Sequence, residues 1–262
     1  MNIINKKWLF LAIIMTFLMG HSNAQMSHAT PLSGKQLTQE FIQQNLCYPE
    51  KALESNSSGD VVVGFHVDAE GNASGHYVKS SFSEEANPIA LDLVRKIRWA
   101  PATQNMSPVD SDMEYTVEFR TRAYRRYWKK HQRVVMPLTL DFDTSYAIYE
   151  TRQLEEMAKP YFEEGGNMAH YLLSNLKYPE SARAAEISGT VRLSFVVETD
   201  GSVSNILIDQ SVGGGCDNEA VRLLQETHWI PAVKNGKYVR SHNLQDITFN
   251  IGTRNYQDGN AY

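Results

Sequence analysis

The sequence contains one segment twice, and this duplication limits what the chain can fold into. Residues 41–120 (copy one) recur as residues 171–250 (copy two) with a constant offset of 130 and no gap. A repeat of this length predicts two tandem domains rather than a solenoid of short units. The shared residues are mostly apolar residues, glycines and prolines, so the duplication has preserved a fold and shows no shared catalytic set. Identical pairs include Asn45/Asn175, Leu46/Leu176, Tyr48/Tyr178, Pro49/Pro179, Gly71/Gly201, Trp99/Trp229, Pro101/Pro231 and Phe119/Phe249.

The first 24 residues have the pattern of a secretory signal peptide. Lys6 and Lys7 precede an apolar run from Trp8 to Met19, and Ser22-Asn23-Ala24 provides small residues before Gln25. A run of about a dozen residues is shorter than the roughly 20 that a membrane-spanning helix needs, so we expect cleavage and export to the periplasm. Anchoring in the inner membrane by residues 8–19 is the alternative interpretation.

Composition and motifs exclude several classes of function. Removing the signal peptide takes away two lysines and no acidic residue, so the formal net charge changes from −5 to −7, which argues against nucleic-acid binding. The chain has no G-x-S-x-G, H-E-x-x-H or C-x-x-C motif and no phosphate-binding glycine loop, so we expect no enzyme activity, no cofactor and no small-molecule substrate. The eight histidines are scattered, which argues against a metal site.

The two cysteines do not form a repeated framework. Cys47 and Cys216 occupy different positions in the two copies. A disulfide between the domains and two separate thiols with packing roles both remain open, because pairing depends on a Cα separation that sequence does not give.

Each copy predicts the same order of elements. In copy two, Pro179 suits the start of a short helix, and Val191 to Val197 alternate apolar with other residues, as a strand with one buried face does. Asp200-Gly201 supplies the residues of a hairpin turn, and Val203 to Ile208 forms the returning strand.

A second helix and a final strand complete each copy. The helix is predicted from about Asn218 to Thr227 in copy two and after Asn87 in copy one, and the strand carries Ile247 and Phe249 in copy two. The predicted fold class is therefore α+β, with two tandem α-β-β-α-β domains, each an antiparallel sheet with helices on one face.

Copy two carries an ordered set of motifs over about 90 residues. They are Pro160, Phe162, Gly165-Gly166, Tyr171-Leu172, Asn175 to Ala182, Gly189, Phe195-Val196-Val197, Asp200-Gly201, Gly213 to Asp217, Ala220, Trp229, Pro231-Ala232 and Asn235-Gly236-Lys237. This order and spacing resemble the C-terminal domain of the bacterial TonB energy-transducer family. Copy one is similar to a divergent member, because it lacks the Gly-Gly lead-in and has Phe82-Ser83-Glu84-Glu85 in place of the glycine turn.

The resemblance implies a periplasmic module that engages outer-membrane TonB-dependent receptors and takes part in energy-coupled transport. Its physical basis is the addition of an extended peptide to a free sheet edge. Other envelope proteins, or a complex with a full-length transducer, are further expected partners. Tyr178 and Phe249 also suit purely structural roles. Carried over to this sequence, the candidate peptide-binding residues are Gly165, Gly166, Asn175, Leu176, Lys177, Tyr178, Leu244, Asp246, Thr248 and Asn250.

The resemblance also implies features that this chain lacks. A complete transducer of the family has an N-terminal membrane helix and a long proline-rich arm. Here about 16 residues with the single proline Pro31 precede copy one, and they reach at most roughly 55 Å. We therefore do not expect energy transduction by this chain alone. An envelope structural or interaction protein, docking on periplasmic proteins or peptidoglycan, is the alternative function.

The predicted organisation is a signal peptide (1–24), a short linker (25–40), the divergent domain (41–120), a connector (121–159), the second domain (160–252) and a flexible tail (253–262). The connector opens with cations interleaved with Tyr124, Tyr127 and Trp128 and then turns acidic. Contact with anionic lipid headgroups or glycan is one interpretation, and a solvated helix paired with the acidic stretch is the other. Within a connector of this length, Leu154 to Tyr161 is expected to be helical.

Overall fold

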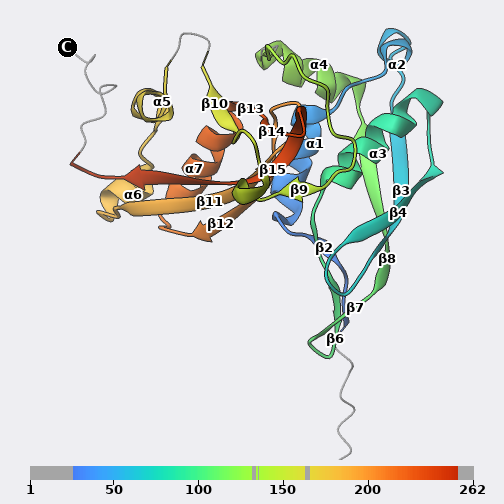
Figure 1. The fold of residues 1–262 in the computed structure, drawn as a ribbon, viewed down its shortest axis with the longest axis horizontal. Helices are drawn as coiled ribbons and strands as arrows, with labels where there is room; N and C mark the ends of the chain where they lie inside the picture. The colour runs from blue at the N-terminus through green and yellow to red at the C-terminus, as the bar shows by residue number, and fades with distance from the viewer. Residues whose placement is uncertain (1–25, 132–133, 135, 163–165, 253–262) are drawn as a thin grey trace, which may run out of the picture.

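The computed structural model describes residues 26–131, 134, 136–162 and 166–252, so the expected signal peptide and tail lie outside the described residues (Figure 1). Copy one and its lead-in contain β1 (Met26–Ser27), β2 (Thr30–Pro31), α1 (Gly34–Asn45), α2 (Glu50–Glu54), β3 (Gly59–Val67), β4 (Ala73–Ser80), η1 (Glu84–Ala86), α3 (Asn87–Lys96), β5 (Trp99–Ala100), β6 (Ala102–Gln104), β7 (Ser107–Val109) and β8 (Ser111–Phe119). The connector contains α4 (Thr121–Lys130), β9 (Ile148–Tyr149) and η2 (Thr151–Gln153). Copy two and its lead-in contain β10 (Lys159–Tyr161), α5 (Met168–Asn175), α6 (Glu180–Ala184), β11 (Gly189–Val197), β12 (Val203–Gln210), α7 (Cys216–Gln225), β13 (His228–Ile230), β14 (Ala232–Lys234) and β15 (Lys237–Phe249).

Both copies form the predicted antiparallel sheet, and the α+β class is confirmed. The strand order is β4-β3-β8 in copy one and β12-β11-β15-β14 in copy two. The register repeats with the offset of 130, since Gly59 lies opposite Phe119 and Gly189 opposite Phe249. The apolar residues predicted to face the core are all buried: Val61, Val63, Phe65 and Val67 in β3, and Val191, Leu193, Phe195 and Val197 in β11.

Each hairpin turns at a glycine that other residues do not replace without strain. Gly71 has a φ of 87° and Gly201 a φ of 83°, a conformation that side chains disfavour. A Cβ atom on Gly71 would lie 2.5 Å from the carbonyl oxygen of Trp99, and one on Gly201 would lie 2.2 Å from that of Trp229. The Trp-x-Pro turn therefore packs directly against the hairpin in both copies.

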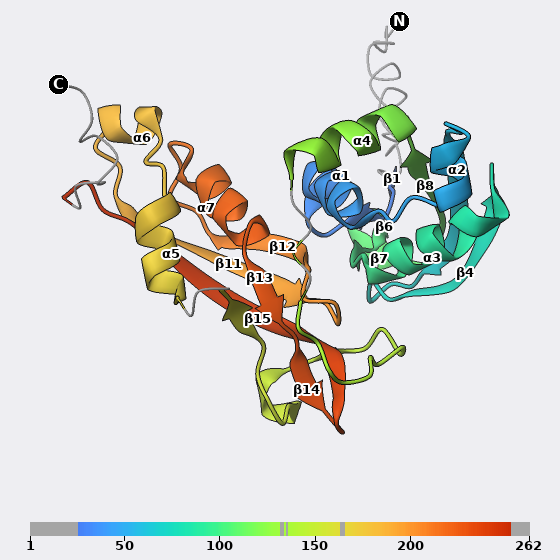
Figure 2. The same ribbon diagram turned by 90° about the horizontal axis from the view of Figure 1, so that it is seen from above.

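Helices cover one face of each sheet, and each copy has its own apolar core (Figure 2). In copy one α3 packs on β3 and β4, and in copy two α7 packs on β11 and β12. Phe65 and Phe119 are central to the first core, and Phe195 and Phe249 to the second. Burial of a phenylalanine contributes roughly 1.5–3 kcal/mol.

The duplication extends into the segments before each copy. Pro31 of β2 lies opposite Trp99, and Pro160 of β10 lies opposite Trp229. Each lead-in thus adds a short strand beside the Trp-x-Pro turn. The described part of residues 25–40, expected as a linker, contains β1, β2 and the first half of α1.

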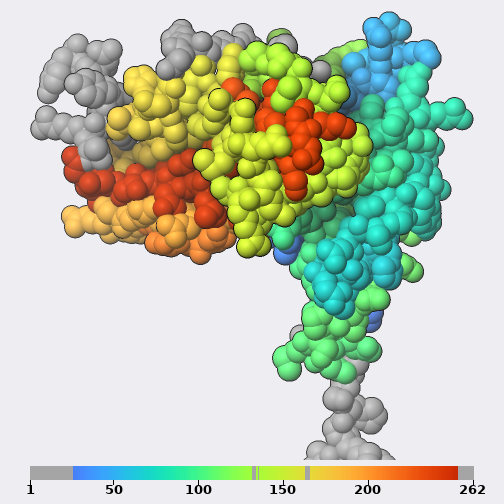
Figure 3. Space-filling view, in the orientation of Figure 1, coloured from blue at the N-terminus to red at the C-terminus, as the bar shows by residue number. Residues whose placement is uncertain are grey.

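The connector packs on the hairpin of β14 and β15, where it surrounds the beginning of β15 in the space-filling view (Figure 3). The prediction of a helix from Leu154 to Tyr161 is wrong. Leu154 ends η2, Glu156 forms a bridge to Val233, and Lys159–Tyr161 is β10. Pairing with two strands of copy two has overridden the local helical preference, and Pro160 has no amide hydrogen for a helix.

The two copies meet at a polar junction. Asn205 of β12, whose φ is 51°, accepts a hydrogen bond from the Arg98 amide at 2.7 Å and donates to the Lys96 carbonyl oxygen at 2.8 Å. The buried Lys96 ammonium lies 3.1 Å from Asp92 and 3.5 Å from Asp200. Burial opposes the charge on Lys96, but attraction to Asp200, Glu198 and Asp92 outweighs it and raises the pKa of Lys96.

Helix α1 also belongs to this junction. Leu37 packs against the core of copy two, and Gln225 of α7 donates to the Glu40 carboxylate at 3.0 Å. α1 therefore contributes contacts to both copies.

Cys47 is an exposed free thiol and Cys216 a buried one, so they form no disulfide. The thiols are separate, but of the two only Cys216 is buried as the expected packing role requires. No helix in the described ranges has the length and apolar character needed to cross a membrane.

Candidate peptide-binding edge

β15 has an outer edge that is open along most of its length. Ser241 pairs with Val197 of β11 on one side and with Tyr149 of β9 on the other, so the outer edge is the side opposite β11. From His242 to Phe249 every residue pairs with β11, while no strand in the described part of the chain pairs with them from outside. Unpaired main-chain N–H and C=O groups alternate along such an edge and form a template for an added strand.

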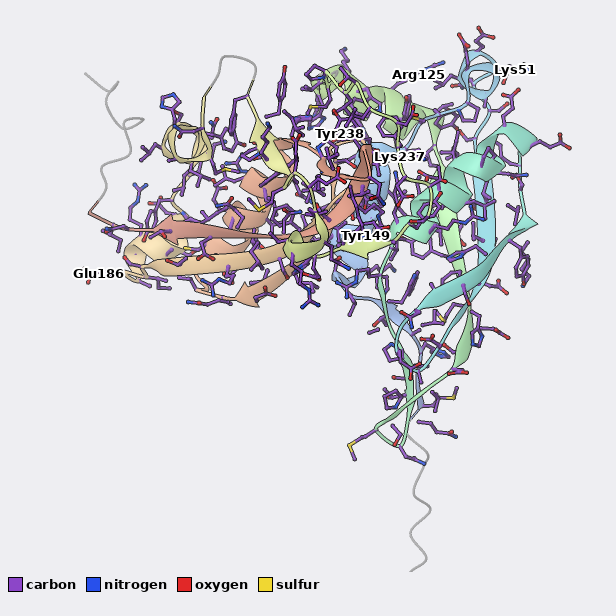
Figure 4. All side chains as sticks on the ribbon, viewed as in Figure 1. Lys51, Arg125, Tyr149, Glu186, Lys237 and Tyr238 are labelled. Atoms are coloured by element: carbon purple, nitrogen blue, oxygen red, sulfur yellow. The ribbon has the colours of Figure 1, made fainter. Side chains whose placement is uncertain are left out.

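The connector already occupies the beginning of β15. Ile148 and Tyr149 pair in parallel with Arg240 and Ser241. Phe142, also in the connector, forms an isolated parallel bridge with Tyr238. Figure 4 labels Tyr149 on β9 and, apart from it, Tyr238 beside Lys237 at the start of β15. The chain therefore performs strand addition on itself, and the open part of the edge begins at His242.

The opposite edge of this sheet is less accessible. It is formed by β12, where Asn205 is bonded to the end of α3 and where α1 packs. Copy one thus covers the first part of β12, so the outer edge of β15 is the longer open edge of the second sheet among the described residues.

Three expected residues lie on the exposed face of β15. Leu244 is 59% exposed. Asp246 accepts two hydrogen bonds of 2.8 Å from Arg192, and this guanidinium holds the pKa of the Asp246 carboxyl below its usual range. The hydroxyl of Thr248 lies 2.9 Å from that of Thr190. Asp246 and Thr248 thus interact with neighbouring side chains of β11, whereas Leu244 is an exposed apolar side chain.

Asn250, the fourth expected residue of this strand, lies just past its end. Its Oδ1 accepts a hydrogen bond of 3.0 Å from the Gly252 amide. It therefore closes the turn that follows Phe249.

Tyr178 supports β15 from the core side. Its hydroxyl donates to the Ile187 carbonyl oxygen, and its ring meets Phe249 edge-on at 5.8 Å. Tyr48 of copy one makes the same edge contact with Phe119 at 5.5 Å. Because both copies share it, this contact belongs to the scaffold.

The residues before Tyr178 join α5 to α7. Asn175 ends α5, and its carbonyl oxygen accepts a hydrogen bond of 2.8 Å from Arg222. Leu176 packs against the core of copy two. The Lys177 amide donates to Glu219 at 2.6 Å, and its side chain is exposed.

Gly165 lies outside the described residues, and Gly166 lines a cavity rather than the strand edge. This cavity of about 470 Å³ lies between α5, β10 and the end of α7, and Asn175 also lines it. A Cβ atom on Gly166 would lie 3.6 Å from Phe162, an ordinary contact. The expected residues are therefore divided between this cavity, the Tyr-Pro turn and β15.

Sequence reasoning missed Leu173, an exposed apolar residue of α5. α5 lies over β15 in two perpendicular views (Figures 1 and 2), and Leu173 is 69% exposed. At the equivalent positions of Leu173 and Leu244, copy one has Gln43 and Glu114. Comparing the two copies position by position would have revealed this exchange of polar for apolar residues.

Copy one differs at its corresponding edge, β8. A groove of about 340 Å³ lies there between α1, β8 and α4. The exposed face of β8 carries Asp112, Glu114 and Glu118 in place of the less acidic face of β15. No cluster of His, Cys, Asp or Glu able to hold a metal occurs among the described residues.

Comparisons with known proteins agree with the sequence pattern. The family described as Gram-negative bacterial TonB protein C-terminal matches residues 44–121 and 174–251, which together make up more than half of the chain. Among solved structures, the solution NMR structure of Pseudomonas aeruginosa TonB CTD is similar, with 23% sequence identity over 41% of this chain and 97% of that chain and a TM-score of 0.30. No curated protein matches the chain.

Proposed function

The chain belongs to the TonB C-terminal family, and from this premise we propose that it is a periplasmic protein whose copy two binds an extended peptide of outer-membrane receptors along the outer edge of β15. Through this contact it takes part in energy-coupled transport. The observation that supports the proposal is the open edge from His242 to Phe249, directly beyond the point where the connector pairs with β15. Main-chain hydrogen bonds along this edge supply affinity with few demands on peptide side chains.

The side chains around the edge suggest which peptides it accepts. Successive side chains of an added strand point to opposite faces of the sheet. A residue on one face meets the exposed Leu244, and its neighbour points to the face of the sheet that α5 covers, a helix with the exposed residue Leu173. Peptides with adjacent apolar residues should therefore bind better than peptides with charges at both positions.

Two neighbouring proline variants test the mechanism in the chain that lacks residues 1–24. Along β15, N–H groups point alternately toward β11 and toward the outer edge. Of Leu244→Pro and Gln245→Pro, one therefore removes a hydrogen bond to β11 and destabilises the sheet. The other removes an outer N–H, should stay folded, and should lose most of its affinity for N-terminal receptor peptides of the same organism.

The alanine variants at these positions are the matched controls. Gln245→Ala should bind as the parent does, and Leu244→Ala should show a modest loss, because main-chain groups supply most of the affinity. Glu118→Pro in β8 should leave peptide affinity nearly unchanged. If both proline variants fold and bind like the parent, strand addition on β15 is refuted. If the parent binds no receptor peptide, the alternative of an envelope interaction protein is favoured.

A further inference from the structure

Helix α4 carries a strongly basic face, of which the fold uses one residue, Arg125. Its ten residues include five cations, and the 100° spacing of a helix places all five on one side. The opposite side holds the helix in place: Tyr124 packs on Tyr48 with ring centroids 5.2 Å apart. The basic face therefore lies on the side of α4 opposite Tyr124, with Arg125 at its border with copy one. Its residues are Arg122, Arg125, Arg126, Lys129 and Lys130.

None of these five cations forms an ion pair within the described part of the chain. Arg125 donates to the Leu53 carbonyl oxygen at 2.6 Å, which fixes α4 against α2, and Arg125 lies with Lys51 on the upper side of Figure 4. The remaining four, Arg122, Arg126, Lys129 and Lys130, are exposed and form no ion pair within the described part of the chain.

The acidic half of the connector does not pair with α4 either. Glu155 accepts hydrogen bonds from the Asn235 and Gly236 amides, at 2.9 and 3.3 Å. Glu150 lies 3.6 Å from His242 and takes part in the capping box of η2. A solvated helix paired with the acidic stretch, one of the two interpretations from sequence, does not describe these contacts.

We propose that α4 is a docking surface for an anionic phospholipid bilayer. The chain has a formal net charge of −5, yet it concentrates a fifth of its 25 lysines and arginines in ten residues. Charge complementarity thus directs this face, and not the molecule as a whole, to an anionic surface. Because Tyr124 is packed on copy one, the contact is electrostatic and peripheral rather than an insertion of apolar residues.

The test is co-sedimentation of the chain lacking residues 1–24 with vesicles of phosphatidylcholine containing about 30% phosphatidylglycerol, compared with pure phosphatidylcholine vesicles. We expect binding to the anionic vesicles at about 0.05 M salt, loss of binding at about 0.5 M, and no binding to the neutral vesicles. The triple variant Arg126→Glu, Lys129→Glu, Lys130→Glu should bind the anionic vesicles at least on the order of 100-fold more weakly than the parent. Each cation near an anionic surface contributes roughly five-fold to the affinity.

A second triple variant controls for net charge. Lys35→Glu, Arg98→Glu and Arg152→Glu make the same change in charge at exposed cations outside α4, and this variant should keep most of its vesicle binding. Circular dichroism establishes that both variants are folded. Equal loss in the two variants, or binding to soluble polyphosphate without binding to vesicles, would overturn the proposal. Receptor-peptide affinity should be unchanged in the α4 variant, so this test and the test of peptide binding fail separately.

Discussion

Replacing Arg240 with methionine should lower the free energy of unfolding by about 3–5 kcal/mol. The guanidinium donates to both oxygens of Glu198, at 2.7 and 2.8 Å, and to the carbonyl oxygens of Tyr146 and Lys96, each at 2.8 Å. It thus joins copy two, the connector and the end of α3 in copy one. Arg240 is 4% exposed and Glu198 is fully buried, so water does not screen the attraction between the two charges.

The magnitude follows from what the variant leaves behind. Methionine fills much of the volume but leaves the Glu198 carboxylate buried with the hydroxyl of Ser204 as its remaining donor. Removing one partner of a buried pair costs about 3–5 kcal/mol, because the other charge stays desolvated. The Tyr146 carbonyl oxygen also loses its hydrogen-bond donor, whereas the Lys96 carbonyl oxygen keeps the donor of Asn205. The unsatisfied Tyr146 carbonyl costs about 1–3 kcal/mol, and this cost is not simply added to the cost of the unpaired Glu198 charge.

Urea titrations at pH 7, followed by circular dichroism, measure the effect in Arg240→Met, Glu198→Leu and the double variant. The double variant removes both charges, so it should be more stable than Arg240→Met by at least about 2 kcal/mol. A loss below about 1 kcal/mol in Arg240→Met would refute the reasoning. So would a double variant whose destabilisation equals the sum of the two single effects, because then the two charges would not be coupled.

Three further predictions follow from other contacts. Gly201→Ala should destabilise the protein clearly more than Gly213→Ala, because both have positive φ but only at Gly201 would the Cβ atom meet a carbonyl oxygen at 2.2 Å; urea titration compares the two variants. Burial opposes ionisation of Asp200, but attraction to Lys96 outweighs burial and holds the pKa of this carboxyl below its usual range. The contribution of Asp200 to stability is therefore present above the unfolded pKa of about 3.9 and is lost as pH falls through the lower pKa of the folded state. The stability difference between the parent and Asp200→Asn should therefore shrink below about pH 4 in titrations across pH. A fragment starting at residue 136 should unfold at a higher urea concentration than one starting at residue 153, because only the longer fragment keeps β9 paired with β15.

The elements that sequence predicted correctly are those set by local rules. Alternation along β3 and β11, and glycines at the hairpin turns, follow from the backbone of the strands themselves. The connector was not predictable in this way, because Ile148 and Tyr149 become a strand only by pairing with Arg240 and Ser241, far away in sequence. Its apolar residues have no period that distinguishes such a strand from a short helix.

The candidate site was only partly predictable, because sequence does not tell which apolar side chains are exposed to water. Leu244 was expected in the last strand from the family pattern, but the missed Leu173 has ordinary helix neighbours, and sequence does not tell whether a leucine on a helix faces the core or water. Tyr178 and Phe249 show the reverse case. Both lie where the pattern placed them, and the matching contact of Tyr48 with Phe119 favours the structural role that the sequence also suggested.

The two copies share one fold and differ at the residues through which they contact each other. The junction residues have no counterparts across the repeat, since Lys96, Asn205 and Arg240 align with Glu226, Gly75 and Asp110. Through these residues copy one holds β12, one edge of the second sheet, and the connector holds the start of β15. Because the chain itself occupies both of these places, the strand addition that we propose for copy two would take place at His242–Phe249. In this proposal the divergent copy restricts where copy two binds its peptide.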